Sequence, residues 1–446
     1  MVKHIVIGGG ISGLKIASEI YDYLVLERGS TVGGRIKTIK KDNQVLYEAG
    51  PWRVHESHER VLKHLNFTPE EKEKNKIPFD PPTSESTDEM SGMTLFDTLV
   101  FKNGLQYAIQ KDLDSGYYGN LDTMGGNYRH KAGAYYKVPG GYASLVDKLK
   151  NKCKKESIKF NHRVINVCKK NNLYHVHCKI RQGNEFISKV YECNVLFICC
   201  PPKNTRSWDI CKKYLRAQLN LVKTYPLNHI YAKGKPLPTK HIVTNNELSQ
   251  IIPGNHDQEW FQASYTGGKM ARFWANLRYN HPLHFKDKLI ELLKKELGKE
   301  VVISHYDMHY WQNGVHMWIP AFQAKVDNWV ERCLIPHPKH LPNVYWAGEA
   351  FSSYQGWVEG ALETSEKVLD LYKTIQTTYK PIAFDKTKHL ILDGRILNPE
   401  KWKEVHPGTK SAIEAHLGED ISLLFRQIGH SGQAWAHAFS IQEGFI

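Results

Sequence analysis

The sequence predicts an α/β fold with a Rossmann-type domain that begins at the first residues, an α+β region inserted into it, and a small α+β module at the C-terminus. Three observations support this prediction. Residues 2–7 are apolar and lead through a glycine-rich turn into a helix with an apolar face. Residues 342–372 repeat the order strand, glycine-rich turn and helix. Beyond a plausible linker at residues 379–382, residues 382–446 carry an apolar pattern of their own.

The glycine-rich turn after the first strand has the spacing of a dinucleotide-binding site. Gly8, Gly10 and Gly13 form the pattern Gly-x-Gly-x-x-Gly, and Ser12 lies where the helix begins. These glycines allow a tight turn, a close approach to a pyrophosphate and close packing of helix on sheet. The helix N-terminus attracts phosphate. Glu27 ends the next expected strand, near the usual spacing of about 20 residues, and can accept hydrogen bonds from a ribose.

Later motifs separate FAD from NAD. Gly33, Gly34 and Arg35 follow the acidic residue closely, and a second glycine–arginine turn beside the pyrophosphate is typical of FAD proteins. Far along the chain, an expected strand delivers Gly348 and Glu349 to the start of a second helix. A carboxylate there suits the ribityl hydroxyls of a flavin, and the N–H groups of a helix start suit its pyrimidine edge. The sequence therefore predicts that the chain binds FAD.

Between these motifs the sequence predicts a loop-rich segment, helices and strands in turn. Residues 66–92 are rich in Pro, Glu, Lys and Ser, which predicts a loop-rich segment. Residues 142–150 predict an amphipathic helix, and residues 160–199 predict a meander of short strands. Residues 225–320 mix strands with one strong helix at 286–297.

Several of these segments resemble the flavin-dependent amine oxidase superfamily, which includes monoamine, polyamine and L-amino-acid oxidases. The resemblance extends from residue 1 to about 372 and is carried by residues 4–35, 48–53, 138–146, 163–167 and 344–367. It implies an FAD-binding domain split by a substrate domain. The expected FAD-binding parts are residues 1–65, 138–225 and 321–378, and the expected substrate-domain parts are residues 66–137, which are loop-rich, and 226–320.

The resemblance also implies which residues contact the cofactor. Besides the glycines, the serine, the arginine and the acids named above, they are Arg28, Gly50, Pro51, Trp52, Arg53, Val164, Gly356, Trp357, Val358 and Ala361. Among them, Val164 is expected beside the adenine.

An aromatic substrate site in front of the flavin is a further implication. Trp357 matches a family position held by Tyr or Trp, Trp311 matches a second aromatic position, and Trp318 is another candidate. Aromatic rings exclude water and can hold an amine by their π-faces. The segment at residues 50–53 resembles the Gly-Pro-Met-Arg of L-amino-acid oxidases, whose arginine holds the substrate carboxylate. The tryptophans could instead be core residues, and Arg53 could instead contact an FAD phosphate or a surface carboxylate.

One family position departs from the pattern. Most members carry a lysine that holds a water against the reactive flavin nitrogen, before an Ile-Phe or Ile-Tyr pair. Here His229 precedes Ile230 and Tyr231. Lys233 lies an even number of residues further on, which would return its side chain to the same face of a strand. His229 and Lys233 are therefore alternative occupants of this position, and the departure argues against efficient oxidation by molecular oxygen.

The C-terminal module resembles the cytochrome b5 fold. His406 precedes a Pro-Gly turn, and His430 follows an expected helix and a glycine. Apolar residues at helical spacing lie between them: Ile413, Leu417, Leu424, Phe425 and Ile428. Two histidines on facing segments can bind the iron of haem b from both sides, which leaves no open position for oxygen and suits electron transfer. Thr409 replaces the family's second glycine, and the usual first helix is expected to be short or absent.

Composition bears on partners and location. The formal net charge is +14, but the lysines are spread along the chain without a compact basic block, so nucleic-acid binding is not expected. No run of about 18 apolar residues predicts a membrane span, and the first residues do not form a secretory signal. The eight cysteines include no Cys-x-x-Cys pair, which is typical of reduced thiols. We expect a cytoplasmic protein, or a virion protein if it is viral, as some similar proteins are.

Together these features predict an FAD-dependent oxidoreductase that takes a hydride from the carbon bearing an amino group. Arg53 would orient a carboxylate if the substrate is an amino acid. Electrons would pass to a haem at His406 and His430, or to oxygen. Two other functions stay open, namely a flavin desaturase or isomerase of an apolar substrate and a non-catalytic structural protein that retains the fold. The sequence does not predict the oligomeric state.

Overall fold

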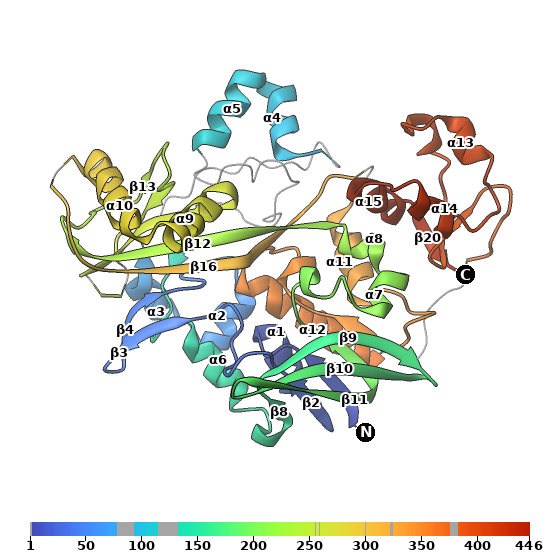
Figure 1. The fold of residues 1–446 in the computed structure, drawn as a ribbon, viewed down its shortest axis with the longest axis horizontal. Helices are drawn as coiled ribbons and strands as arrows, with labels where there is room; N and C mark the ends of the chain where they lie inside the picture. Colours follow the sequence, from blue (N-terminus) through green and yellow to red (C-terminus); the bar gives the residue numbers. More distant parts are fainter. Residues whose placement is uncertain are drawn as a thin grey trace.

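Most of the chain folds into regular elements. The computed structural model describes residues 2–77, 93–114, 133–254, 256–257, 259–298, 300–321, 324–374 and 382–446. Figure 1 shows a mixed sheet near the N-terminus, a long second sheet above it, and a separate C-terminal module. None of the described helices is both long and apolar enough to cross a bilayer. The eight cysteines all lie in described residues and are free thiols.

A seven-stranded sheet forms the predicted Rossmann-type domain. Strand β1 (Val2–Ile7) lies parallel to β2 (Tyr23–Leu26) and to β11 (Glu185–Ile198), and β2 lies parallel to β8 (Ile158–Lys159). On its other side, β11 pairs in parallel with β17 (Val344–Trp346). The strands that carry the two glycine motifs, β1 and β17, therefore flank β11. Both turns leave from the carboxyl edge of the sheet, where ligands bind in open α/β sheets.

The predicted strand meander extends this sheet. Strands β9 (His162–Lys170) and β10 (Leu173–Gln182) pair antiparallel, and β10 pairs antiparallel with the first half of β11. The second half of β11 pairs with β1, so this one strand joins the meander to the parallel part. Asn171 and Asn172 turn the chain between β9 and β10 with positive φ angles of 47° and 61°.

Helices cover both faces of the sheet. One face packs against α1 (Ile11–Ala17), α6 (Ala143–Lys150) and α12 (Val358–Thr374). The other face packs against α7 (Asp209–Tyr214), α8 (Arg216–Leu219) and α11 (Val326–Leu334). Consecutive apolar residues of β1 alternate between the two cores, with Val6 in the first and Ile5 and Ile7 in the second. Burial of both faces explains why β1 reads as a continuous apolar run.

The second sheet has β12 (Val222–Lys235) between β15 (Trp260–Gly267) and β16 (Val302–Trp318), all antiparallel. Helices α9 (Gly268–Asn280) and α10 (Pro282–Leu297) pack on one face of it through a core that includes Trp274 and Phe285. Helix α10 is the strong helix of the sequence pattern, and it begins earlier than predicted because Pro282 occupies its first turn.

Other strands of the main body form small two- and three-stranded sheets. They are β3 (Thr38–Lys41) with β4 (Gln44–Glu48), β13 (Ile242–Val243) with β14 (Gln250–Ile251), and β7 (Tyr135–Tyr136) between β5 (Val54–His55) and β6 (Lys76–Ile77).

The expectation of a loop-rich segment after residue 66 is wrong for three stretches. Residues Pro69–Asn75 form α3, Leu95–Asn103 form α4, and Leu105–Asp114 form α5. The Thr68 hydroxyl caps α3 by accepting the Glu71 N–H at 3.2 Å, and the Thr94 hydroxyl caps α4 in the same way. These local capping signals outweigh the polar composition. Residues 78–92 and 115–132 lie outside the described residues.

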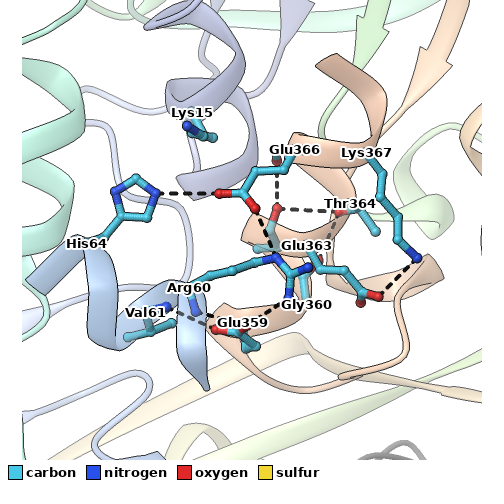
Figure 2. A network of polar contacts seen from close by, with 12 residues as sticks. Lys15, Arg60, Val61, His64, Glu359, Gly360, Glu363, Thr364, Glu366 and Lys367 are labelled. Carbon is cyan, nitrogen blue, oxygen red and sulfur yellow. Dashed lines mark hydrogen bonds and ion pairs between the residues drawn. The ribbon is translucent and has the colours of Figure 1, made fainter. Parts of the chain in front are cut away.

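A buried glutamate ties α2 (Glu59–Leu65) to the start of α12, as Figure 2 shows. The Glu359 carboxylate accepts the N–H groups of Arg60 and Val61 at 3.2 and 3.0 Å, and the Arg60 guanidinium at 3.0 Å. Burial raises the pKa of Glu359 against these contacts. A second glutamate of α12, Glu366, accepts Arg60 Nε at 3.0 Å. The network fixes α2 to the helix that follows the second glycine motif.

The C-terminal module packs directly on the rest of the chain. Its sheet contains β18 (Leu390–Leu392), β19 (Arg395–Leu397) and β20 (Gln442–Phe445). Its helices are α13 (Lys410–Glu414), α14 (Ser422–Gln427) and α15 (Gly432–Ser440). The apolar side chains of α15 belong to the same buried cluster as α8 and α11. Figure 1 shows α15 beside α8, with α13 on the far side of the module.

Arg395 lies buried in this joint. Its guanidinium donates to the carbonyls of Pro336 (2.9 Å) and Tyr214 (3.1 Å) in the body, and to the Gln442 side chain (2.8 Å) in the module. Burial, reinforced by the neighbouring Arg332, lowers the pKa of Arg395 to about 9. One side chain of the module thus satisfies two buried carbonyls of the body.

Replacing Arg395 by alanine is expected to lower the free energy of unfolding by about 2–4 kcal/mol, because it orphans two buried carbonyls and leaves a cavity. Urea denaturation measures this loss, and limited proteolysis should cut the variant near the linker. Arg181→Ala is the matched control, since Arg181 is exposed and its side chain donates only to the nearby Gly183 carbonyl among the hydrogen bonds of the described residues. An Arg395→Ala protein as stable as the control would contradict the assigned role.

Candidate active site

The two N-terminal glycine turns lie in direct contact. The Gly33 N–H donates to the Gly9 carbonyl at 2.8 Å, and Gly33 pairs with Gly10 as an isolated parallel bridge. Gly8 has a φ of +109°, and a Cβ on Gly13 would lie 1.9 Å from the Gly8 carbonyl oxygen. The first turn of α1 therefore packs on the Gly8 backbone at a distance that no side chain allows.

Glu27 lies at the end of β2, beside these turns. Its two carboxylate oxygens accept the N–H groups of Gly9 (2.8 Å) and Gly29 (2.7 Å). The His162 N–H donates to the backbone carbonyl of Glu27 at 2.8 Å, which brings the start of β9, with Val164, next to Glu27. Arg28, the following residue, is exposed. Each carboxylate oxygen can accept a further donor, so Glu27 remains suited to a ribose hydroxyl.

The starts of α1 and α12 lie side by side. The Ser12 hydroxyl donates to the Ala361 carbonyl at 3.1 Å, and α12 begins at Val358. A Cβ on Gly348 would meet no atom within 4 Å, and one on Gly10 would meet only the Gly34 Cα, at 3.9 Å. Two helix N-termini and two glycines that face open space form the cradle that an FAD molecule requires, so the residues present fit this cofactor.

Glu349 connects the glycine–arginine turn to the second glycine motif. The Arg35 guanidinium and His316 Nδ1 (2.7 Å) both bond Glu349 Oε1, and the Gly356 N–H donates to Oε2 at 3.2 Å. Arg35 also donates to the Gly314 carbonyl at 2.9 Å. Burial by itself would raise the pKa of Glu349, but Arg35 and His316 outweigh it and lower the pKa to about 2. The carboxylate is therefore ionised at neutral pH.

Three aromatic side chains from other elements hold the backbone of residues 48–53. Tyr231 donates to the Glu48 carbonyl (2.7 Å), Trp311 to the Ala49 carbonyl (2.6 Å) and Tyr142 to the Arg53 carbonyl (2.9 Å). Within the segment, a Cβ on Gly50 would lie 2.0 Å from the Arg35 carbonyl oxygen. The backbone at Gly50, just before Pro51, therefore packs closely against the glycine–arginine turn of residues 33–35. Trp311, predicted as a wall of the site, thus joins it by anchoring the segment that carries Arg53.

Arg53 lies in an aromatic cage. Its guanidinium carbon is 4.4 Å from the ring centre of Trp52, 5.2 Å from that of Trp357 and 5.3 Å from that of Tyr135. Only 7% of the residue is exposed. The structure therefore brings the predicted Arg53 and Trp357 together. Tyr135 was not predicted, since it comes from an aromatic stretch without periodicity. A cation in such dry surroundings attracts an anion more strongly than it would in water.

His229 is a buried residue of β12. It is 2% exposed, and its Nδ1 contacts the Gln262 side-chain amide at 3.0 Å. The Tyr265 ring lies 4.7 Å away, centre to centre. Burial, with the charges of His309 and Arg53, lowers the pKa of His229 to about 3. The imidazole is therefore neutral at physiological pH. Gln262 and Tyr265 were missed because strand alternation alone does not mark them.

Two sequence candidates lie elsewhere. The Lys233 side chain is 40% exposed and pairs with Glu259 at 2.6 Å, so it does not share the buried position of His229. Even alternation does keep Lys233 on the face of β12 that His229 occupies, with Ile230 and Ala232 in the core on the opposite face, but Lys233 lies about 13 Å further along the strand, where its side chain is partly exposed. Trp318 is wholly buried and donates to the Ser352 carbonyl at 3.2 Å, which makes it a core residue and not a wall of the site.

The two histidines of the C-terminal module, His406 and His430, each contact a backbone carbonyl through Nδ1. His406 Nδ1 contacts the Thr409 carbonyl at 3.3 Å, and His430 Nδ1 contacts the Phe425 carbonyl at 3.0 Å. Carbonyl acceptors place the ring protons on Nδ1, which leaves each Nε2 lone pair for a metal. The Phe425 ring stacks on His430 at 3.9 Å.

The apolar surroundings of these histidines also suit haem. Val405 is 55% exposed beside His406, and Leu423 and Ile428 are 67% and 62% exposed near His430. Exposed apolar side chains flanking two imidazoles fit the donor set of a bis-histidine haem. Thr409 adopts a φ of +79°, a conformation that favours the glycine which the family has there.

Comparisons with known proteins identify the domain families along the chain. The family model of the NAD(P)-binding Rossmann-like domain matches residues 6–66, and that of the cytochrome b5-like heme/steroid binding domain matches residues 383–442. The model of the flavin containing amine oxidoreductases matches residues 112–368. A search of curated proteins found no match.

A solved structure described as a putative protoporphyrinogen oxidase from Exiguobacterium sp. 255-15 shares the fold. It is 13% identical, aligns over 84% of this chain and 99% of its own, and has a TM-score of 0.62. The predicted fold class and family are confirmed. The chain belongs to the flavin containing amine oxidoreductase family, and it carries a cytochrome b5-like domain at its C-terminus.

Proposed function

We propose that the protein is an FAD-dependent oxidoreductase that oxidises an amino acid, or another amine, at the carbon bearing the amino group. The observation that carries this proposal is the buried Arg53 within a cage of Trp52, Tyr135 and Trp357. The family indicates the class of reaction, and the arginine in the cage favours a substrate that carries a carboxylate.

The chain's own residues would hold the cofactor as follows. The Gly8–Gly13 turn and the start of α1 would receive the pyrophosphate, Glu27 a ribose, and Glu349 the ribityl chain. When bound, FAD supplies the hydride acceptor of the reaction. The protein contributes orientation and a dry site.

Arg53 would orient the substrate. Its guanidinium can bind a carboxylate with two parallel hydrogen bonds, which fixes the rest of an amino acid relative to the arginine. Trp357 and Tyr135 would exclude water and contact the amine or the substrate side chain by their faces. Because the pKa of His229 is about 3, this residue would act as a neutral hydrogen-bonding group and not as a base near pH 7.

The C-terminal module would receive electrons. His406 and His430 would hold haem b through their Nε2 atoms, and the bound haem would supply one-electron transfer. The Arg395 contacts hold the module against the body, which supports transfer within the chain. Molecular oxygen is the alternative acceptor.

Arg53→Ala is expected to raise the KM for amino acids by about 30- to 100-fold, because a bidentate, charge-assisted contact is lost. Amines without a carboxylate should keep their KM. Steady-state kinetics with paired substrates, each amino acid beside its decarboxylated amine, measure this difference. Arg53→Lys should recover part of the affinity. An equal effect on both members of a pair would contradict the carboxylate contact.

An anaerobic substrate screen tests the proposed function more broadly. Amino acids or amines should bleach the flavin absorption of the wild-type protein. Bleaching only by apolar or polyene compounds would support a desaturase or isomerase instead. A protein that takes up neither cofactor would support a structural role.

A further inference from the structure

The two carboxylate oxygens of Glu349 differ in the number of hydrogen bonds that they accept. Oε1 accepts from both Arg35 and His316 Nδ1, the latter at 2.7 Å. Oε2 accepts only the Gly356 N–H, at 3.2 Å, among the hydrogen bonds of the described residues. A carboxylate oxygen takes about two donors. The open acceptor capacity therefore lies on Oε2.

The two groups on Oε1 differ in how firmly they are held. The Arg35 side chain is 33% exposed, whereas His316 is wholly buried on β16. A long, partly exposed side chain retains more rotamer freedom than a buried ring on a strand. His316 is therefore the better candidate to fix the orientation of the carboxylate.

Burial of the His316 ring carries a free-energy cost that an apolar side chain would not have. Its Nε2 is buried and has no hydrogen-bond partner within the part of the chain that the structure describes. A buried ring nitrogen without a partner is unfavourable, and a phenyl ring of similar shape would avoid that cost. The benefit that offsets it is the Nδ1–H bond to Glu349.

We propose that His316 is a positioning residue of the flavin site. Together with Arg35 it saturates Oε1 of Glu349, and it thereby turns Oε2 toward the ribityl hydroxyls of FAD. The inference rests on the proposed function, because it requires that the site bind FAD. It assigns the geometry of the ribityl contact to a residue outside both glycine motifs.

Three substitutions separate the two ring nitrogens. His316→Phe keeps the ring and removes both, His316→Asn keeps an amide N–H near the place of Nδ1, and His316→Gln keeps one near the place of Nε2. Titration of each apoprotein with FAD, followed by flavin fluorescence, measures the Kd. His316→Phe should weaken FAD binding by about 10- to 100-fold, as expected for the loss of a hydrogen bond to a charged group. His316→Asn should recover most of the affinity, and His316→Gln little.

The dependence on Glu349 supplies a second readout that a general packing defect would not reproduce. In a Glu349→Ala background, His316→Phe should add less than about threefold, since both changes break the same contact. His305→Phe is the matched control, because that side chain lies on the same strand and is 62% exposed. It should leave the Kd unchanged.

The outcomes distinguish this inference from the proposed function. Unchanged FAD affinity in His316→Phe, additive effects in the double variant, or recovery by His316→Gln alone would overturn the positioning role and leave the proposed function intact. A wild-type apoprotein that binds no FAD would overturn both.

Discussion

Gly13→Ala is expected to abolish flavin binding and to destabilise the protein by about 3 kcal/mol or more. The added Cβ would lie 1.9 Å from the Gly8 carbonyl oxygen, and that atom is backbone in the turn itself. Relief of the clash requires α1 to move away from the sheet. The helix N-terminus that receives the pyrophosphate would move with it, and such a displacement should cost at least about 100-fold in affinity.

Flavin content after purification, FAD titration and urea denaturation together measure these effects. Gly183→Asn serves as the control, because Gly183 has a φ of +61° and a Cβ there would meet no atom within 4 Å. Asparagine tolerates this backbone conformation. A Gly13→Ala protein with wild-type FAD affinity would show that the turn does not contact the cofactor.

His406→Ala and His430→Ala should each abolish the Soret band while the flavin band remains. Each substitution removes one of two axial ligands, and the module is small, so little else would retain the iron. Absorption spectra after reconstitution with haemin test this. His416→Ala is the control, since His416 lies in the same module, is 38% exposed and contacts Glu419. Full haem retention in both ligand variants would show that the histidine pair is not the iron site.

Local sequence signals predicted the parts of the site that depend on backbone conformation. The glycine positions could be predicted because tight turns and close approaches restrict the residue type. The structure brings Gly8, Gly13 and Gly33 together, and the Arg35–Glu349 contact joins the second glycine motif to them. The strand meander and α12 could be predicted from the periodicity of their apolar residues. The family resemblance extended this reading to Arg53 and Trp357, which meet in the cage although about 300 residues separate them.

The residues that were missed act through tertiary contacts. His316, Gln262 and Tyr135 lie on strands whose alternation gives their faces but not what lies opposite. Lys233 was misplaced because alternation predicts the face of a strand but not the burial along it, and four residues carry Lys233 about 13 Å from His229 to a partly exposed part of β12. The role of Arg395 in joining the two parts of the chain left no signal, since its partners are backbone carbonyls, which every residue type supplies.

The absorption spectrum of the purified full-length protein, reconstituted with FAD and haemin, tests the central claim most directly. The proposed function predicts one flavin and one haem per chain, and a flavin band that an amino acid bleaches in the absence of oxygen. A protein that takes up no flavin under these conditions would contradict the account.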